Sequence, residues 1–271
     1  MSVLTALGDG AVVAKRNLIK IKRVPDLLVF TTLQPIMFVV LFAYVFGGAI
    51  NLAGSEDGGK AYREFLIAGI FTQTVVFGAT ITGAGLADDI QKGIIDRFRS
   101  LPMSQGAVLI GRTLSDVANN ILVVVVMTIT GLAVGWRIRS SLVEALGGFV
   151  LLLAFAYAFS WVMAYVGLLA PSPEVVNNAS FIVIFPLTFI AGTFVPVATL
   201  PGPLRTFAEW NPVSSVAEGA RQLFGNVIPT AEPPQSWALQ HPVVYTLIWA
   251  LAILVIFVPL ANYQYRRAAS R

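Results

Sequence analysis

The chain has no cysteine and only one histidine, His241. Without cysteine it can form no disulfide, no iron–sulfur cluster, no zinc–thiolate site and no thiol nucleophile. A lone histidine also excludes a metal site built from a histidine cluster. Charged residues are scarce as well, at 12% of the 271 residues, against roughly 25% in an average soluble protein. The sequence therefore predicts neither redox nor metal chemistry.

Apolar residues dominate instead, at 56% of the chain, with a mean hydropathy of +0.78. So few charges cannot cover so much apolar surface in water, so we expect part of the surface to face lipid. The net charge is +4, but no basic patch with interleaved aromatic residues points to nucleic acid as a partner. A bacterial inner-membrane protein with basic cytoplasmic edges accounts better for the positive charge.

Six stretches without Asp, Glu, Lys, Arg or His are long enough to cross a bilayer core, which takes about 20 residues in a helix. The predicted fold is thus a single all-α membrane domain over 1–271, with six transmembrane helices at 27–46, 65–86, 117–135, 145–170, 175–200 and 243–263. Twelve lysines and arginines flank one side of these spans and six flank the other. The positive-inside rule then places both termini in the cytoplasm. The first span is too long for a cleaved signal peptide.

Residues 1–25 are predicted to form an amphipathic interfacial helix before the first span. Apolar residues recur at spacings of three and four, while basic residues lie on the opposite side. A basic amphipathic helix in this place is typical of a segment on the cytoplasmic leaflet. The alternative is a solvated basic tail that only orients the first span.

Segment 87–102, after the second predicted span, is predicted to form a short amphipathic helix on the cytoplasmic side. Asp88 and Asp89 are typical of a helix N-terminus, and Pro102 ends the helix. The apolar side chains at helical spacing are Ile90, Ile94, Phe98 and Leu101. Periodicity alone does not distinguish a helix that lies on the membrane from one that docks on a partner protein.

Segment 201–242 between the last two spans is long and rich in proline, which predicts a structured external cap of short helices. One of them is expected over 214–224, with Ser214 or Ser215 as its N-cap and Gly225 as its stop. Within the fifth span, Pro186 removes one backbone hydrogen bond and is expected to bend the helix.

Residues 54–61 come close to a phosphate-binding loop, but Ala61 replaces the Ser or Thr that would hold Mg²⁺. No predicted span contains Asp, Glu, Lys, Arg or His, which argues against a membrane protease, a proton relay and an ion-driven carrier. Sodium sites built from carbonyls and hydroxyls remain open. We therefore expect a chain that is not an enzyme by itself, binds no cofactor and takes its energy from a partner.

Between the second and third spans the sequence reads KGIIDRFRSLPMS over 92–104 and GRTLSD over 111–116. Before the last span it reads NPVSS over 211–215, followed by Arg221. The Gly, Arg-Phe, Leu-Pro-Met and Gly-Arg series, with the later Asn-Pro, resembles the membrane subunits of ABC-2 type exporters, in particular the daunorubicin/doxorubicin-resistance permeases. The resemblance extends over nearly the whole chain and is poorest around Gly192 and Thr193.

The resemblance implies that this membrane subunit pairs with a second one, identical or related, and with two copies of a separate P-loop ATPase that holds ATP and Mg²⁺. Segment 87–102 would be the coupling helix that docks into the ATPase. Its interface residues would be Asp88, Asp89, Ile90, Lys92, Ile94, Arg97, Phe98, Arg99 and Leu101. Spans 1, 2 and 5 would line the pathway, and the external gate region would include Asn211, Pro212 and Arg221.

The function implied is export of a hydrophobic or amphiphilic compound (a drug, lipid or secondary metabolite) by alternating access. One alternative keeps the scaffold and changes the cargo to a lipid-linked glycan or glycolipid. A second alternative is a stand-alone carrier or a membrane scaffold that transports nothing. Aromatic residues in the spans do not separate these alternatives, because core packing or lipid contact is their default role.

Overall fold

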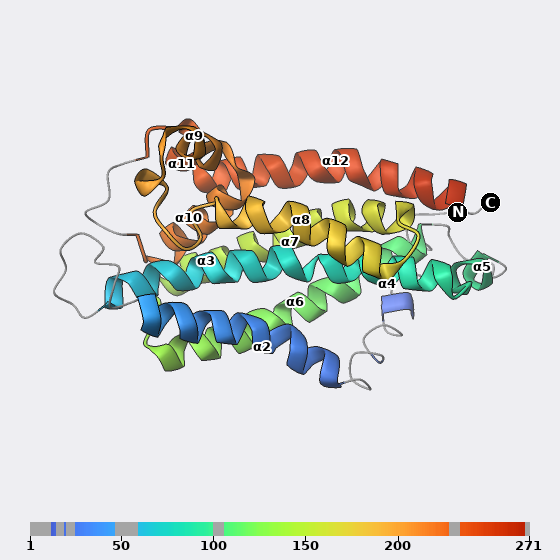
Figure 1. Ribbon diagram of the computed structural model, residues 1–271, viewed down its shortest axis with the longest axis horizontal. Coiled ribbons are helices and arrows are strands. Elements are labelled where there is room, and N and C mark those ends of the chain that lie inside the picture. The colour runs from blue at the N-terminus through green and yellow to red at the C-terminus, as the bar shows by residue number, and fades with distance from the viewer. Residues whose placement is uncertain are drawn as a thin grey trace.

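The computed structural model describes residues 12–14, 19, 25–46, 59–99, 106–227 and 234–268. Within these ranges all regular secondary structure is helical, and the long helices lie side by side in one elongated bundle (Figure 1). Most of the predicted interfacial helix 1–25 lies outside the described residues, as does Leu101. The all-helical prediction is therefore confirmed for the described part of the chain.

The long helices run alternately up and down the bundle (Figure 1). In chain order they are α2 (Pro25–Leu41) with a π-helical turn (Phe42–Phe46), α3 (Lys60–Gly78) with α4 (Thr80–Gln91), α6 (Ala107–Val134), α7 (Leu142–Leu169), α8 (Pro173–Phe189) and α12 (Pro242–Ala268). Helix α2 begins and helix α12 ends at the same end of the bundle, beside the short helix α5 (Ile94–Arg99). We call this the α5 end.

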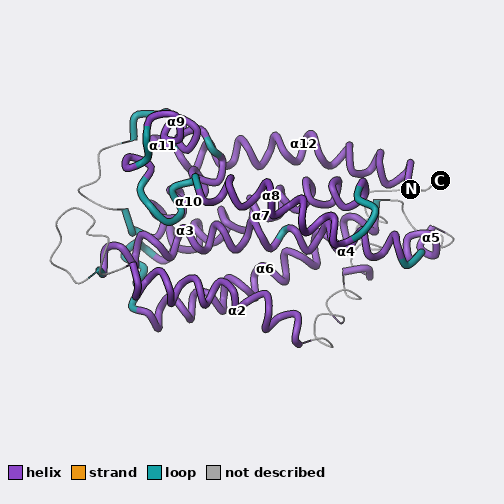
Figure 2. Tube along the Cα trace, viewed as in Figure 1, coloured by secondary structure: helices purple, strands orange, loops and turns teal. Residues whose placement is uncertain are grey.

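The opposite end, which we call the cap end, carries the short helices of segment 201–242. They are α9 (Gly202–Trp210), α10 (Pro212–Phe224) and α11 (Trp237–Gln240), preceded by a 3₁₀ turn (Val197–Thr199). Described loops also gather there (Figure 2). The prediction of short helices in this segment is thus correct, although α10 is largely buried against the long helices.

Four helical stretches are long and apolar enough to cross a membrane: Lys60–Gln91, Ala107–Val134, Leu142–Leu169 and Pro242–Arg267. Two shorter apolar helices, Thr32–Val45 and Pro173–Phe189, correspond to the first and fifth predicted spans. The structure therefore contains a helix at each of the six predicted places, four of them of full span length. The count of six spans and the cytoplasmic position of both termini stay predictions.

Two helix ends differ from the predicted span boundaries. The third helix begins at Ala107 instead of 117 and so carries Arg112 and Asp116 into the bundle, where both are buried. The fifth helix ends at Phe189 instead of 200, and the chain turns back with Gly192 at a φ of 62°. In both cases side chains from elsewhere in the bundle supply hydrogen bonds, which apolar content alone does not reveal.

Local signals explain where several helices begin and end. In helix α7, Ser141 and Glu144 form a capping box, which satisfies two free N–H groups at its start. Helix α10 begins with Asn211 as N-cap and Pro212 in its first turn, so the expected cap at Ser214 or Ser215 is wrong. Its predicted stop is correct, because Gly225 ends it with a φ of 70°.

Two buried apolar clusters hold the bundle together. The larger one joins α3, α6, α7 and α10, and the smaller one joins α4, α5, α6, α7 and α12 at the α5 end. Helices α4 and α7 touch backbone to backbone, because a Cβ on Gly167 would lie 2.2 Å from the carbonyl oxygen of Gly83. Such close contact through small residues is typical of helix packing in membranes.

Candidate functional site

The predicted coupling helix is two helices rather than one. Helix α4 continues out of the bundle to Gln91, and helix α5 starts anew at Ile94. The break is at Gly93, which has a φ of 64° and donates from its backbone N–H to the carbonyl of Ile90 at 3.0 Å. Asp88 and Asp89 therefore lie in the last turn of α4, not at a helix start. Glycine in the left-handed region commonly ends a helix, and this signal was available in the sequence.

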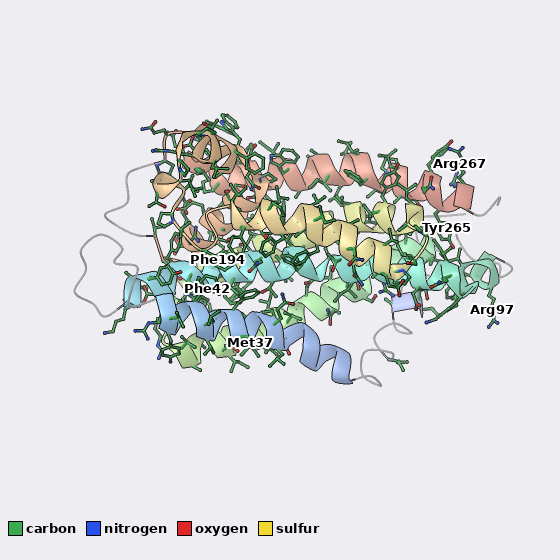
Figure 3. All side chains as sticks on the ribbon, in the orientation of Figure 1. Met37, Phe42, Arg97, Phe194, Tyr265 and Arg267 are labelled. Carbon is green, nitrogen blue, oxygen red and sulfur yellow. The ribbon has the colours of Figure 1, made fainter. Side chains whose placement is uncertain are left out.

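The charged residues of this segment lie in different environments. Lys92 donates to Asp88 at 2.8 Å, and this hydrogen bond raises the pKa of Lys92. Asp89 is buried, whereas Arg97 is exposed at the tip of α5 (Figure 3). The side chain of Arg99 lies outside the described residues. Asp89 and Arg97 thus lie in opposite environments, one buried and the other exposed.

The apolar residues of the segment divide between the bundle and the outside. Ile95, which the sequence analysis missed, is buried, and both Ile90 and Phe98 pack on the smaller apolar cluster. Ile94 is half-buried. The single stripe predicted for Ile90, Ile94 and Phe98 is thus wrong, because the break at Gly93 resets the helical phase. Helix α5 is attached to the bundle through Ile95 and Phe98, which are three residues apart and share a face.

Directly inside the α5 end lies a buried charge network that the sequence analysis placed in a loop. Arg112 donates from Nη2 to the carbonyl of Ile81 at 2.9 Å, and its Nε lies 3.7 Å from Asp116 Oδ2. The hydroxyl of Thr82 donates a short hydrogen bond to the same carboxylate oxygen. Nε of Arg112 has no hydrogen-bond partner among the described residues. The network therefore joins α4 to α6 without using all of its donors.

A glycine makes room for this network. A Cβ on Gly85 would lie 1.8 Å from Nη2 of Arg112, so the guanidinium occupies the notch that the missing side chain leaves on α4. The sequence did contain a signal for the pair, since Arg112 and Asp116 are four residues apart, the spacing of neighbours on a helix. The partners on α4, about 30 residues earlier, could not be read from it.

At the cap end Arg221 is fully paired. Its Nε donates to the carbonyl of Phe65 at 3.0 Å, and its Nη2 donates to the carbonyls of Gly192 at 2.9 Å and Thr193 at 3.3 Å. Its Nη1 donates to Glu218 at 3.3 Å, and the guanidinium lies 3.5 Å from the centre of the Phe65 ring. Arg221 thus fixes the turn after α8 against α3.

Asn211 ties the same turn to helix α10. Its Oδ1 accepts from the backbone N–H of Val213 at 2.9 Å, and its Nδ2 donates to the carbonyl of Leu187 at 2.7 Å. Pro212 is the first residue of α10. The three residues predicted for the external gate region are therefore brought together around the turn that ends α8.

A row of phenylalanines connects α8 with α2. Rings of Phe181, Phe185 and Phe189 follow one another along α8 at centroid distances of 5.0 and 4.7 Å. Phe194 continues the row beyond Phe189. Its ring stacks on the ring of Phe42 at a centroid distance of 4.6 Å (Figure 3). These helices correspond to the first and fifth predicted spans. Within the described residues, no group of three His, Cys, Asp or Glu side chains is placed to hold a metal ion.

Comparisons with known proteins agree with this architecture. The ABC-2 type transporter family model matches residues 11–224. The daunorubicin resistance ABC transporter permease protein DrrB1 of Streptomyces coeruleorubidus is 35% identical over 208 residues, which cover 77% of this chain and 72% of the relative. The probable doxorubicin resistance ABC transporter permease protein DrrC of Mycobacterium tuberculosis is 25% identical over 239 residues, 87% of this chain and 80% of that protein. The chain therefore belongs to the ABC-2 type transporter family, as a multi-pass membrane protein with relatives among drug-resistance permeases.

Proposed function

We propose that this chain is the membrane subunit of an ABC exporter that moves a hydrophobic or amphiphilic compound (a drug, lipid or secondary metabolite) out of the cell. ATP with Mg²⁺ would be hydrolysed by a separate P-loop ATPase, present in two copies, beside a second membrane subunit that is identical or related. The observation that carries this proposal is the 35% identity to a daunorubicin resistance permease over 77% of the chain. The proposed setting is the bacterial inner membrane.

The proposed topology has six spans, with the α5 end in the cytoplasm and the cap end outside. Helix α8 has 17 residues and is about 26 Å long, close to the hydrocarbon thickness of about 30 Å. Basic residues support the orientation, since Lys92, Arg97, Arg266 and Arg267 all belong to the α5 end. Both termini would then be cytoplasmic.

The proposed ATPase interface comprises Asp88, Asp89, Ile90, Lys92, Ile94, Arg97, Phe98, Arg99 and Leu101. Ile95 and Phe98 attach α5 to its own bundle, whereas Ile94 is half-buried and Arg97 is exposed. A force applied to α5 by ATPase closure would therefore pass into α4, α6, α7 and α12. Differential binding of ATP would then shift the population between inward-open and outward-open packings.

On the outer side, Asn211, Pro212 and Arg221 hold the turn after α8 to α3 and α10. We expect this assembly to move as one body when the outer gate opens, because breaking buried hydrogen bonds in a membrane protein is unfavourable. The aromatic row on α2 and α8 would line the pathway beside α3 and α4.

The first test is affinity purification of the tagged chain from its native membrane in mild detergent. The expected result is a co-purifying P-loop ATPase in stoichiometric amount, with ATP hydrolysis that vanadate inhibits. A preparation that contains no ATPase, even after chemical crosslinking, would contradict the proposal and favour a stand-alone carrier. The same preparation allows the cargo classes to be compared, because daunorubicin and a lipid-linked glycan can each be tested for stimulation of hydrolysis.

A further inference from the structure

A cavity of about 180 Å³ lies between α2, the junction of α3 with α4, and α6. Its polar lining consists of two threonine hydroxyls and four side-chain amides, those of Gln34, Gln73, Asn119 and Asn120. Phe38 and Phe77 contribute aromatic rings, and no charged side chain among the described residues lines it. The cavity is therefore polar but uncharged, which is unusual for the interior of a membrane bundle.

The cavity lies near the middle of the bundle's length. Asn120 is in the middle of the 28-residue helix α6, about 20 Å from either end at 1.5 Å per residue. Gly78 is likewise near the middle of the 32-residue stretch Lys60–Gln91. In a membrane this depth corresponds to the hydrocarbon core, which is about 30 Å thick. Lipid head groups do not reside there, so a polar occupant has to arrive by another route.

The backbone is irregular on two walls of the cavity. Pro35 lies inside α2 and supplies no N–H to the carbonyl four residues earlier. At the α3–α4 junction the N–H of Thr82 donates to Ala79, three residues back, at 3.1 Å. The hydroxyl of Thr80 donates to the carbonyl of Phe77 at 2.7 Å. Such breaks in membrane helices occur where the backbone lines a cavity or is buried in protein.

The amides that face the cavity lack protein partners. Oδ1 of Asn120 is buried and accepts no hydrogen bond from any residue that the structure describes. Gly78 makes room for it, because a Cβ there would lie 2.6 Å from that oxygen. The amides of Gln34, Gln73 and Asn119 form no hydrogen bond with any residue that the structure describes. Gln73, Asn119 and Asn120 are buried, whereas Gln34 is exposed. Buried amides are nearly always paired, so three of them without partners indicate an occupant with polar groups.

We infer that this cavity is a recognition site for exported cargo and that it takes an uncharged, ring-sized group carrying a hydroxyl or another hydrogen-bond donor. The inference rests on the export function proposed above. The donor would bond to Oδ1 of Asn120, while Phe38 and Phe77 contact the ring. The size fits, since an engineered apolar cavity of about 150 Å³ in another protein binds benzene. The absence of charge in the lining disfavours ionic groups.

The test uses two probes that differ only in the hydroxyl, 4-fluorophenol and fluorobenzene. The purified full-length chain in lipid nanodiscs is titrated with each probe by ¹⁹F NMR, and empty nanodiscs measure partition into lipid. For the native chain we expect saturable binding of 4-fluorophenol, at least about fivefold tighter than that of fluorobenzene. In Asn120→Leu, which keeps the size of the side chain, 4-fluorophenol binding should weaken about tenfold, the loss expected for one hydrogen bond.

A matched control is Asn262→Leu on α12, where the same chemical change is made away from the cavity. It should leave both affinities unchanged. Since Asn120→Leu removes an amide oxygen that has no partner, the variant should remain folded, which gel filtration checks. Equal binding of the two probes, or an unchanged hydroxyl preference in Asn120→Leu, would overturn the inference.

The outcomes also separate this inference from the proposed function. Hydroxyl-dependent binding in a chain that recruits no ATPase would leave the cavity site standing and remove the exporter. Export with a partner ATPase, but without any hydroxyl preference, would leave the exporter standing and remove the cavity site.

Discussion

Two arginines are buried among the described residues, and the bundle binds them in opposite ways. At the cap end, Arg221 donates to three backbone carbonyls and to Glu218, and it packs on the Phe65 ring. At the α5 end, Arg112 has a single hydrogen bond to a carbonyl, lies 3.7 Å from Asp116 and leaves Nε without a partner. Every nitrogen of the Arg221 guanidinium therefore has a hydrogen-bond partner, whereas Nε of Arg112 has none among the described residues.

The difference indicates which end can rearrange. A buried charge is unfavourable unless its hydrogen bonds are made, so every displacement of Arg221 would break several bonds at once. A shift of α6 against α4 breaks two hydrogen bonds, from Arg112 to Ile81 and from Thr82 to Asp116, which is fewer than the four that Arg221 makes. A transporter that alternates between two packings needs contacts that only a few hydrogen bonds hold, such as those of Arg112. We therefore expect the α5 end to adjust and the cap end to move as a rigid unit.

The largest effect is expected for Arg221→Ala. Removing the guanidinium leaves three buried carbonyl oxygens without a donor and frees the turn after α8, at a cost of about 3–5 kcal/mol in unfolding free energy. The variant should accumulate poorly in the membrane and melt at a lower temperature in detergent. Arg221→Lys should recover only part of the loss, because an ammonium lacks the planar fork of donors.

Arg139→Ala is the matched control for that variant. Arg139 pairs with Glu64 at 2.7 Å, but its side chain is exposed, and an exposed pair contributes at most about 1 kcal/mol. A normal membrane level for Arg221→Ala, or an equal loss for both variants, would show that the turn does not depend on the buried arginine.

A smaller effect is expected for Asp116→Ala. This change removes the carboxylate that accepts from Thr82 and faces Arg112. Since Arg112 keeps its bond to the Ile81 carbonyl, we expect the free energy of unfolding to fall by about 1–3 kcal/mol. Asp116→Asn keeps an acceptor for Thr82 without the charge, so the gap between the two variants measures the contribution of the charge. A loss as large as that of Arg221→Ala would show that both ends are equally rigid.

Much of this fold follows from local patterns in the sequence. Helix α7 runs over Leu142–Leu169 where 145–170 was predicted, since its apolar run is unbroken and Ser141 and Glu144 mark its start. The stop of α10 at Gly225 was predicted for the same kind of reason. An apolar run bounded by a cap or a glycine is therefore predictable without knowledge of its neighbours.

The elements that were predicted wrongly depend on contacts between distant segments. Arg112 and Asp116 were placed in a loop because charges rarely enter a span, and only the partners on α4 make them acceptable inside α6. The apolar residues after Phe189 were predicted as helix, and the turn there depends on Arg221, about 30 residues later. Asp88 and Asp89 suit a helix start, but α4 arrives at them from inside the bundle.

The smallest effect is expected for Gly85→Ala, and the sharpest comparison is the one with Gly69→Ala. In Gly85→Ala the new methyl would meet Nη2 of Arg112, which lies at the far end of a flexible side chain. The guanidinium can move aside and lose its bond to Ile81, at about 1 kcal/mol, and alanine regains about as much through its helix propensity. Its melting temperature should therefore stay close to that of the native chain.

Gly69→Ala is the counterpart at the cap end. There the methyl would lie 2.0 Å from the backbone oxygen of Thr193, which Arg221 holds in place and which cannot yield in the same way. Overpacking of this kind lowers stability by about 1–3 kcal/mol. Thermal melts of the two purified variants in the same detergent make the comparison directly. Equal losses would mean that Arg112 is held as firmly as the turn, and the distinction between an adjustable and a rigid end would fail.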